Sequence, residues 1–558
     1  MNLRKVLLVA FVLSGIAALI YEIAWTRPLQ IIFGSTIYSL SMILAAFMIG
    51  LSLGSYLASL YADKIKNLPL SYALIEIGIG IYAVLLIIIF NKLPSIYTLL
   101  HNSFHTQFYI FSFIQFVLVF FVLLVPTTLM GFSFPLVVKF YTGERIGKGV
   151  GTVYSANTFG AIIGSFSAGF ILIPLFGVRY SIIFAGMVNV LVGCIILFIA
   201  SKSLAKKIIP AVAVLFLFIS VVGNYNIGRL TIGSFYYTYL SEEDIKDSEI
   251  LFYKDSLYGT VTVLNFEGAK SLLINGKGEG STAFRDIRTN YLLAYFPLLL
   301  HKNPETGLNI GLGTGTTSGV LNKFTKTETI EIDPAIVEAS KQFKDFNKDV
   351  LSQPHHSLVI ADARNHLLIN PKKYDIITSE PADPWQSTST NLYSKEFYEI
   401  VREHLNENGL FAQWVPIYEF SVKDFRIFYN TFQSVFPHVI AFGNARDEII
   451  DNYKVPTTEI ILIGSNEEIK LDWDEISQKI ENSEIKSDFE FIKIKDLDAL
   501  KNLFYFTDEG MEGYGAEAPM VTDNKPVLEF SSARTIIHGR DPAKVVGDIE
   551  GYLKEKDG

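Results

Sequence analysis

Cysteine is almost absent from this chain of 558 residues, and charged residues are scarce. The single cysteine, Cys194, excludes an intramolecular disulfide. No His-x-His or Cys-x-x-Cys pattern occurs, so the sequence predicts no metal site. Charged residues make up 18% of the chain, and 56 acidic residues outweigh 47 basic ones for a net charge of −9. This acidic balance argues against nucleic acid as a partner and is compatible with a small cationic substrate.

The charges are scarcest in the first part of the chain, which is apolar with basic loops. Its apolar stretches, of roughly 17 to 25 residues, are long enough to cross a lipid bilayer. They lie at 6–26, 36–60, 70–90, 108–132, 152–174, 180–200 and 208–224. The first has no clear cleavage site, so we expect a retained anchor and not a signal peptide. We therefore expect residues 1–228 to form a multi-pass α-helical membrane domain with about seven spans.

Two carboxylates stand inside these predicted spans, Glu22 in IYEIAW and Glu76 in LIEIGIG. An acidic residue within a bilayer is a candidate for function, because burying its charge there is costly. A position near a helix end, or a hydrogen bond to a neighbouring helix, is the alternative interpretation.

The loops between the predicted spans differ in charge. Lys5, Lys64 and Lys207 belong to the set of loops that holds most of the basic residues, whereas Lys92 and Arg179 belong to the other set. The positive-inside rule then places the N-terminus in the cytoplasm. With an odd number of spans the soluble part lies outside the cytoplasm, but a change of one span reverses this, so its side of the cell membrane stays open.

The chain after residue 228 has the pattern of a soluble α/β protein. Residues 250–275 alternate like strands joined by a turn at Glu267-Gly268, and we assign 229–290 to a β-hairpin and linker region. Strand and helix patterns then alternate within 291–558, which is typical of a parallel sheet covered by helices on both faces.

Ligands of such sheets bind beyond the carboxyl ends of the strands. Gly311, Gly313 and Gly315 directly follow the first strand, where they would let the backbone approach a ligand at a helix N-terminus. Thr316 replaces the last glycine of the dinucleotide fingerprint, which disfavours a nicotinamide or flavin dinucleotide.

Acidic residues end the next strands. Glu331 could accept hydrogen bonds from both hydroxyls of a ribose, and Asp362 could accept one from an adenine amine. Glu380 and Asp383 follow the fourth strand in SEPADPW, where prolines fix a turn that would aim both acids into one pocket. These strand ends predict a nucleoside pocket; an ordinary tight turn with solvated acids is the alternative.

Ordered motifs along nearly the whole chain resemble the spermidine synthase family, and most of all its membrane-fused members. The motifs are INGKGEGST, NIGLGTGTTSGV, IEIDPAIVEAS, ADARNHLL, SEPADPW with LYSKEFYEIVREHLNENGLFAQW, TDNKPVLEF and the N-terminal ALIYEIAWTRPLQIIFGSTIYSLSMILAAFMIGLSLGS. The resemblance implies a β-hairpin domain followed by a Rossmann-like methyltransferase domain. It also implies that Glu331 holds the ribose, that Asp362 holds the adenine, and that Glu380 and Asp383 bind and deprotonate the attacking amine.

The chain departs from the family's pattern at two positions. Thr314 stands where the soluble synthases have an acid that pairs with the amine of decarboxylated S-adenosylmethionine. Glu380 stands where they have an aspartate. Both departures leave the donor open between decarboxylated S-adenosylmethionine and S-adenosylmethionine, and Asp286 is a second acid that could hold the donor's amine.

Three functions are compatible with these features. The first is a membrane-anchored aminopropyl or related alkyl transferase. The second is an extracytoplasmic acid–base enzyme that acts on a surface polysaccharide or lipid-linked glycan, with Trp385 stacking on a sugar and Asn391 and Tyr393 as polar companions. The third is a transporter that senses polyamines. The sequence does not predict an oligomeric state.

Overall fold

The computed structural model describes residues 3–104, 107–142, 146–222, 227–237, 248–386, 389–443, 448–450, 453–455, 458–538 and 541–557. The chain divides into two compact units. The helical unit comprises residues 1–248, 253–261 and 274–277, and the α/β unit comprises residues 249–252, 262–273 and 278–558. The end of the last predicted span, residues 223 and 224, lies outside the described residues.

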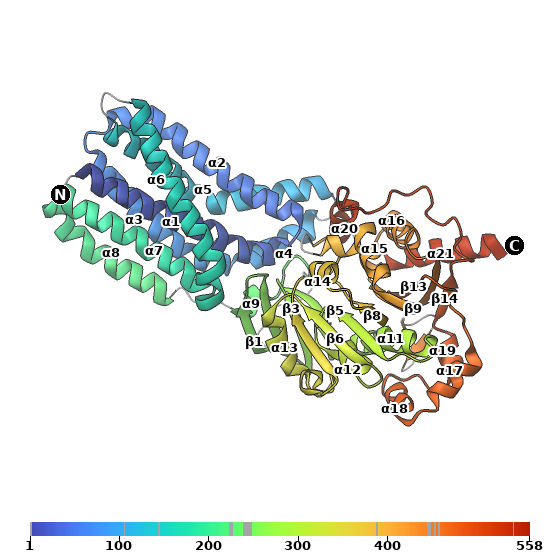
Figure 1. The fold of residues 1–558 in the computed structure, drawn as a ribbon. Coiled ribbons are helices and arrows are strands. Elements are labelled where there is room, and N and C mark those ends of the chain that lie inside the picture. The colour runs from blue at the N-terminus through green and yellow to red at the C-terminus, as the bar shows by residue number, and fades with distance from the viewer. Residues whose placement is uncertain are drawn as a thin grey trace. The chain divides into compact units, whose positions relative to one another are not determined.

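Long helices that run alongside one another make up the helical unit (Figure 1). They are α1 (Leu3–Phe33), α2 (Ile37–Tyr61), α3 (Leu68–Phe90), α4 (Leu93–Phe104), α5 (Phe108–Tyr141), α6 (Ile146–Ser167), α7 (Ile173–Ala200), α8 (Lys202–Val222) and the short α9 (Ile227–Thr231). The longer of these helices are predominantly apolar, which is typical of helices that face lipid or other helices and not water.

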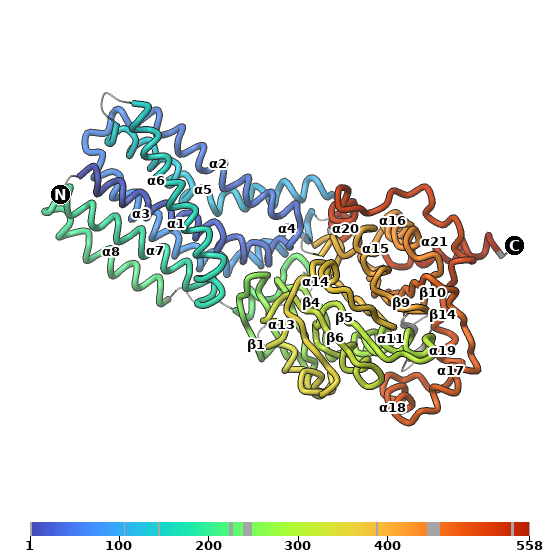
Figure 2. The backbone as a smooth tube through the Cα atoms, in the orientation of Figure 1, coloured from blue at the N-terminus to red at the C-terminus, as the bar shows by residue number. Residues whose placement is uncertain are grey.

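Six helical runs in the described residues are long and apolar enough to cross a membrane. The fifth, Ile146–Ala200, contains α6 and α7, and it bends at Gly177, whose φ of 78° and ψ of 169° are not helical. The predicted spans 152–174 and 180–200 are the two arms of this bent run, which is traced in Figure 2. The prediction of a multi-pass helical region is therefore confirmed, and the predicted number of about seven spans is approximate.

Glycines allow the helices of this unit to approach closely. A Cβ atom on Gly54 of α2 would lie 1.9 Å from the carbonyl oxygen of Thr128 in α5. One on Gly160 of α6 would lie 2.2 Å from the carbonyl oxygen of Val12 in α1. Neither position could hold a side chain without separating the helices, so these small residues fix the packing of α2 on α5 and of α6 on α1.

A four-stranded sheet follows, in the order β1 (Glu249–Asp255), β2 (Thr260–Phe266), β3 (Ala269–Ile274) and β4 (Lys277–Ser281). Glu267 and Gly268 join β2 to β3 with φ values of 50° and 87°. Positive φ at both central residues is the geometry of the tight two-residue hairpin turn. The predicted hairpin and its turn are confirmed.

An eight-stranded sheet forms the centre of the α/β unit, in the order β14-β10-β13-β9-β8-β5-β6-β7. Its strands are β5 (Thr306–Ile310), β6 (Lys326–Glu331), β7 (His356–Ile360), β8 (Tyr374–Ser379), β9 (Leu405–Val415), β10 (His438–Gly443), β13 (Ile460–Ser465) and β14 (Phe504–Thr507). The five strands from β9 to β7 are parallel, and β13, β10 and β14 extend the sheet in antiparallel fashion. A two-stranded ribbon, β11 (Glu448–Ile450) with β12 (Tyr453–Val455), completes the strands of the described chain.

Helices cover both faces of this sheet, as a Rossmann-like fold requires (Figure 1). One face packs against α14 (Ala363–Ile369), α15 (Lys395–Glu403), α16 (Val422–Gln433), α20 (Val527–His538) and α21 (Pro542–Asp557). The other packs against α11 (Phe284–Leu300), α12 (Thr316–Leu321), α17 (Trp473–Ile480), α18 (Ser483–Phe491) and α19 (Leu497–Lys501). The short α13 (Pro334–Ser340) follows β6. Successive residues Ile376 and Ile377 of β8 enter opposite cores, which shows the two-residue period of a strand buried on both sides.

Candidate active site

The candidate site lies where the order of the parallel strands reverses. β5 pairs with β6 on one side and with β8 on the other, so the connections after β5 and β8 leave the sheet in opposite directions. Gly311 follows β5 and donates its backbone N–H to Ile330 at 2.9 Å, and Glu380 follows β8 and donates to Ile310 at 3.5 Å. The two segments that were predicted to bind a ligand therefore border the switch point of the sheet, where α/β proteins bind ligands.

The three glycines after β5 all have left-handed backbone conformations. Gly311, Gly313 and Gly315 have φ values of 88°, 53° and 84°, which residues with a Cβ atom rarely adopt. A Cβ atom on Gly313 would meet no atom within 4 Å, whereas one on Gly315 would lie 3.0 Å from the Asn347 side chain. The loop is therefore held on the side of Asn347 and open above Gly313, where a ligand could approach the backbone.

Glu331 ties the end of β6 to this glycine loop. Its carboxylate accepts hydrogen bonds from the backbone N–H groups of Leu312 and Asp333, each at 2.9 Å. Its side chain is buried, and burial raises its pKa above the usual value despite these hydrogen bonds. Asp362 begins α14 and accepts a hydrogen bond from the backbone of Asn365 at 2.8 Å. Both acids stand at the strand ends where the sequence predicts them.

Thr314 is buried among neutral polar groups. Its hydroxyl lies 2.9 Å from that of Thr316 and 3.5 Å from the side-chain oxygen of Asn290. A Cβ atom on Gly280, at the end of the β-hairpin region, would lie 3.0 Å from the Thr314 methyl group. The loop position that carries an acid in the soluble synthases is thus a neutral hydroxyl beneath β4.

Glu380 is held by α11 and α12. Asn290 donates its side-chain amide to Glu380 Oε1 at 2.9 Å, and the Thr317 hydroxyl donates to Oε2 at 3.5 Å. Burial first, and then the negative charges of Glu459 and Asp286, raise the pKa of Glu380 to about 8. A carboxyl group with that pKa exchanges its proton near neutral pH, as a general acid or base must.

Three further acids surround Glu380. Glu459, which lies just before β13, accepts a hydrogen bond from Thr289 at 2.5 Å, and Asp286 accepts one from Ser281 at 2.5 Å. Glu279 in β4 contributes a smaller repulsion to Glu380. Thr289 and Asn290 are consecutive residues of α11, so one turn of this helix positions both Glu459 and Glu380. Such a group of carboxylates attracts a cation.

Asp383 is fully buried, and Gln386 connects it to Glu279. The side-chain amide of Gln386 donates to Glu279 Oε1 at 2.9 Å and lies 3.5 Å from Asp383 Oδ2. Ser389 donates to the Asp383 carbonyl oxygen at 2.7 Å and fixes the turn. Through Gln386 and Glu279, Asp383 is therefore connected to the polar cluster around Glu380.

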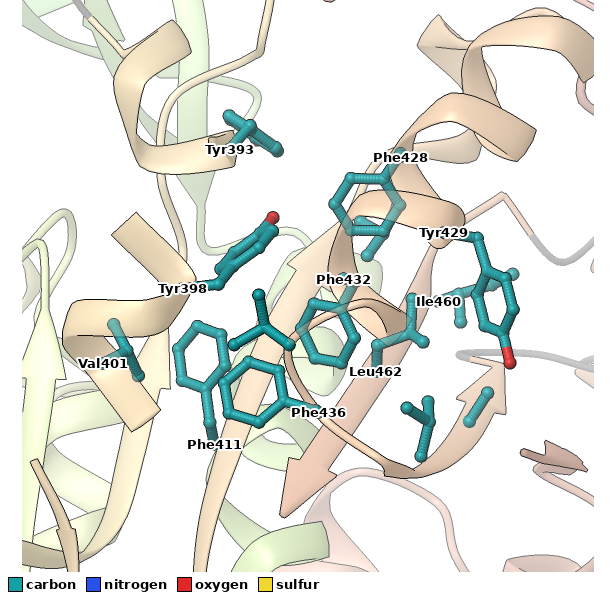
Figure 3. Close-up of a cluster of buried hydrophobic side chains, with 14 of the residues drawn as sticks. Tyr393, Tyr398, Val401, Phe411, Phe428, Tyr429, Phe432, Phe436, Ile460 and Leu462 are labelled. Atoms are coloured by element: carbon teal, nitrogen blue, oxygen red, sulfur yellow. The ribbon is translucent and has the colours of Figure 1, made fainter. Parts of the chain in front are cut away.

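The three predicted companions of these acids lie differently. Trp385 is 2% exposed, and its indole N–H donates to Glu419 at 2.7 Å. Tyr393 is fully buried, packs against Phe428 and donates its hydroxyl to the Ala382 carbonyl oxygen at 3.2 Å. Figure 3 shows Tyr393 at the edge of the buried aromatic cluster. Asn391 is exposed. Stacking of Trp385 on a sugar would require this turn to move, so its binding role stays a prediction.

Several residues of the site were missed from the sequence. Asn290 and Thr289 lie in a helical pattern that is otherwise typical of a buried core. Glu279 lies within a glycine-rich motif and Gln386 directly follows the SEPADPW motif, and neither position has a pattern of its own that indicates a site. Glu459 directly precedes the apolar run of β13. The one signal for it in the sequence is an acid at the edge of a buried strand, and the parallel-strand rule does not cover strands of the antiparallel part of the sheet.

The arrangement places a carboxyl group suited to proton transfer at the same edge of the sheet as the predicted nucleoside-binding groups. The glycine loop, Glu331 and Asp362 form one end of the site, and Glu380 with its neighbouring acids forms the other. Among the described residues, no group of three or more His, Cys, Asp or Glu side chains is arranged to hold a metal ion.

Residues 288–442 match the family described as the spermine/spermidine synthase domain. Polyamine aminopropyltransferase 2 of Aquifex aeolicus is 23% identical over 417 residues, which cover 74% of this chain and 79% of that protein. Thermospermine synthase of Arabidopsis thaliana is 29% identical over 252 residues, covering 43% and 72%. A solved spermidine synthase from Thermotoga maritima is 18% identical and covers 48% of this chain and 88% of its own, with a TM-score of 0.39.

The matched residues begin in α11, include the glycine loop and the ends of β5 to β8, and end in β10. They therefore contain Asn290, Glu331 and Glu380, while the six membrane-capable helical runs precede them. Residues 288–442 thus match a spermine/spermidine synthase domain and follow a multi-pass helical region, and the chain resembles the polyamine aminopropyltransferases.

Proposed function

We propose that this protein is a membrane-anchored aminopropyltransferase, which transfers an aminopropyl group from a nucleoside sulfonium donor to a small cationic amine. The observation that carries this proposal is the position of Glu380. A carboxyl group with a pKa of about 8 lies at the switch point of the sheet, beside three other acids and across from a glycine loop. These are the groups needed to bind a cation and to remove one proton from it.

The donor is decarboxylated S-adenosylmethionine or a closely related sulfonium nucleoside. Glu331 and Asp362 supply acceptors for ribose and adenine at adjacent strand ends, and the space above Gly313 lets the donor approach the backbone. Thr314 cannot form an ion pair with the donor's amine. Asp286 and Glu279 are nearby acids of the same cluster, so they pair with the donor's amine in place of the missing acid, although they lie outside the glycine loop.

The acceptor is an amine that arrives protonated. Its ammonium group binds beside Glu380 and Glu459, and this positive charge favours the ionised form of Glu380. The ionised carboxylate then takes one proton from the ammonium group and leaves a neutral amine with a free electron pair. Asn290 keeps Glu380 Oε1 in place during this step through its hydrogen bond.

The neutral amine attacks the carbon next to the sulfonium. A C–N bond forms, the C–S bond breaks, and its electron pair returns to sulfur, so that methylthioadenosine leaves as a neutral sulfide. The positive charge moves from sulfur to the new secondary ammonium, and no oxidant or reductant is needed. The protein's contribution is to position both partners and to accept the proton.

A product assay tests this proposal. The purified full-length protein is incubated with decarboxylated S-adenosylmethionine and putrescine, and the products are identified by mass spectrometry. We expect methylthioadenosine and an amine larger by one aminopropyl group in equal amounts. A methylated amine with S-adenosylmethionine as donor would replace the aminopropyl assignment, and no turnover with either donor would contradict transfer.

We further propose that the helical unit lies in the cell membrane with its N-terminus and the α/β unit in the cytoplasm, because an adenosyl donor is available there. The basic loops around Lys64 and Lys207 favour the same side for the N-terminus, but seven crossings would place the α/β unit outside. Reporter fusions at Lys207 and after the C-terminus, one active only in the cytoplasm and one only outside it, decide between these orientations.

A further inference from the structure

Glu76 is completely buried among three helices of the membrane-capable bundle. It belongs to α3, and its two carboxylate oxygens accept hydrogen bonds from helices on either side. Ser14 of α1 donates to Oε1 at 2.8 Å, and Asn189 of α7 donates to Oε2 at 2.6 Å. One carboxyl group thus connects α1, α3 and α7 in the interior of the bundle.

The groups around Glu76 are neutral. Among the described residues, the titratable side chains that act on it are Tyr21 of α1 and Tyr72 of α3, and no lysine, arginine or histidine pairs with it. The helices α5 and α8, which also pack on α3, contribute no titratable group to the site in the part of the chain described. An ionised acid at this place has no opposite charge beside it, which is costly within a bilayer.

The direction of the hydrogen bonds is fixed on one side of the carboxyl group and free on the other. Tyr21 donates its hydroxyl to Asn189 Oδ1 at 2.8 Å, so the Asn189 amide nitrogen must face Glu76 as a donor. Ser14 carries a hydroxyl, which can donate to an ionised carboxylate or accept from a protonated one by turning about its own C–O bond. Both charge states of Glu76 can therefore be satisfied without moving a helix.

The Tyr72 hydroxyl gives a second, independent indication. It is buried within interaction distance of Glu76 and Ser14, but neither contact has the geometry of a hydrogen bond in this structure. A buried hydroxyl without a partner costs free energy unless another state of the site uses it. Rotation of Ser14 on protonation would free a position next to Glu76 Oε1 that this hydroxyl can occupy.

We propose that Glu76 is a proton-binding site of the helical unit: it takes up a proton from water and releases it again, and the hydrogen bond with Ser14 reverses each time. The helical unit is then a proton-responsive bundle and not only an anchor. The bond that forms is the O–H bond of the carboxyl group, and the proton comes from the solvent. This inference is independent of the proposed transferase reaction, since it concerns a different unit.

Infrared difference spectroscopy of the full-length protein in lipid vesicles tests the proposal. Spectra are recorded while the pH is changed over about pH 5 to pH 9, a range that includes shifted carboxyl groups. We expect a carboxyl C=O band that appears and disappears reversibly with pH. The band should be lost in Glu76→Gln and should keep its position in Glu22→Gln, a matched change of the other acid in these helices.

Glu76→Gln should fold, because the glutamine oxygen can accept from Asn189 while its amide nitrogen donates to Ser14, as the protonated acid would. Ser14→Ala is the second variant: it keeps the carboxyl group, so the band should remain but change its frequency, since the partner of the O–H group is gone. Because Glu380 also titrates in this range, the band is identified in the difference between the unchanged protein and Glu76→Gln. The absence of a pH-dependent carboxyl band from that difference would overturn the proposal.

Discussion

The side-chain amide of Asn290 donates to Glu380 Oε1 at 2.9 Å, while the preceding residue, Thr289, donates to Glu459 at 2.5 Å. Two adjacent residues of α11 therefore hold two carboxylates of the candidate site. Because these carboxylates repel each other, the site is least stable when both are ionised and no cation is present. The first predictions follow from this repulsion.

Binding of an amine should release a proton. Burial and the neighbouring acids raise the pKa of Glu380 to about 8, so at pH 7 the free site holds this proton. A bound ammonium group lowers that pKa and drives the proton into solution. Calorimetry of putrescine binding in buffers with different ionisation enthalpies should show release approaching one proton at pH 7. The release should decline as the pH rises above 8, where Glu380 is already ionised, and it should be absent in Glu380→Gln.

Removal of the neighbouring charge should weaken this effect. Glu459→Gln takes away the largest repulsion on Glu380, so the pKa of Glu380 should move from about 8 toward its ordinary value. Less of the free site is then protonated at pH 7, and the proton release on amine binding should fall. Glu468→Gln, a change of an exposed glutamate after the same strand, is the matched control and should leave the release unchanged. Equal release in both variants would show that Glu459 does not act on Glu380.

Thr314→Asp should strengthen binding of decarboxylated S-adenosylmethionine. An aspartate at this position adds a charge-assisted hydrogen bond worth roughly 1.5–3 kcal/mol to the donor's amine, or about 10- to 100-fold in affinity. Thr314→Asn has a similar shape without the charge and should give little or no gain. Titration calorimetry on the full-length protein measures both. Tight binding to the unchanged protein, with no gain from Thr314→Asp, would show that Asp286 and Glu279 hold the amine as well as an aspartate at position 314 would.

Most of the candidate ligand-binding edge could be predicted from the sequence because a single rule governs it. Parallel strands end at the same edge of a sheet, so the segments after β5, β6, β7 and β8 had to converge. The glycine loop, Glu331, Asp362 and Glu380 all lie there. Residues from other parts of the fold could not be placed in this way. Asn290 reaches the site from a helix, and Glu459 from an antiparallel strand, 90 and 79 residues away from Glu380 in sequence.

The sequence predicts that Trp385 and Tyr393 face a substrate, but both side chains are buried in the structure. Trp385 follows the acids directly in the sequence, and its aromatic ring there predicted a stacking surface. In the structure, Glu419 provides a buried acceptor for its indole N–H, and this contact draws the ring into the interior. Tyr393 is held in the same way by Phe428 and the Ala382 carbonyl oxygen. In each case the burial of the side chain depends on a partner far along the chain, and the local sequence does not predict that partner.

The rate of methylthioadenosine release by Glu380→Gln tests the central claim most directly. Glutamine keeps the size of the side chain and an oxygen that can accept from Asn290, but it cannot take a proton from the amine. Single-turnover release from decarboxylated S-adenosylmethionine with putrescine should fall about 100- to 10,000-fold, the usual contribution of a general base. Glu407→Gln, a change of an exposed glutamate, should match the unchanged protein. A Glu380→Gln variant that is folded and releases methylthioadenosine at the unchanged rate would contradict the assignment of Glu380 as the base.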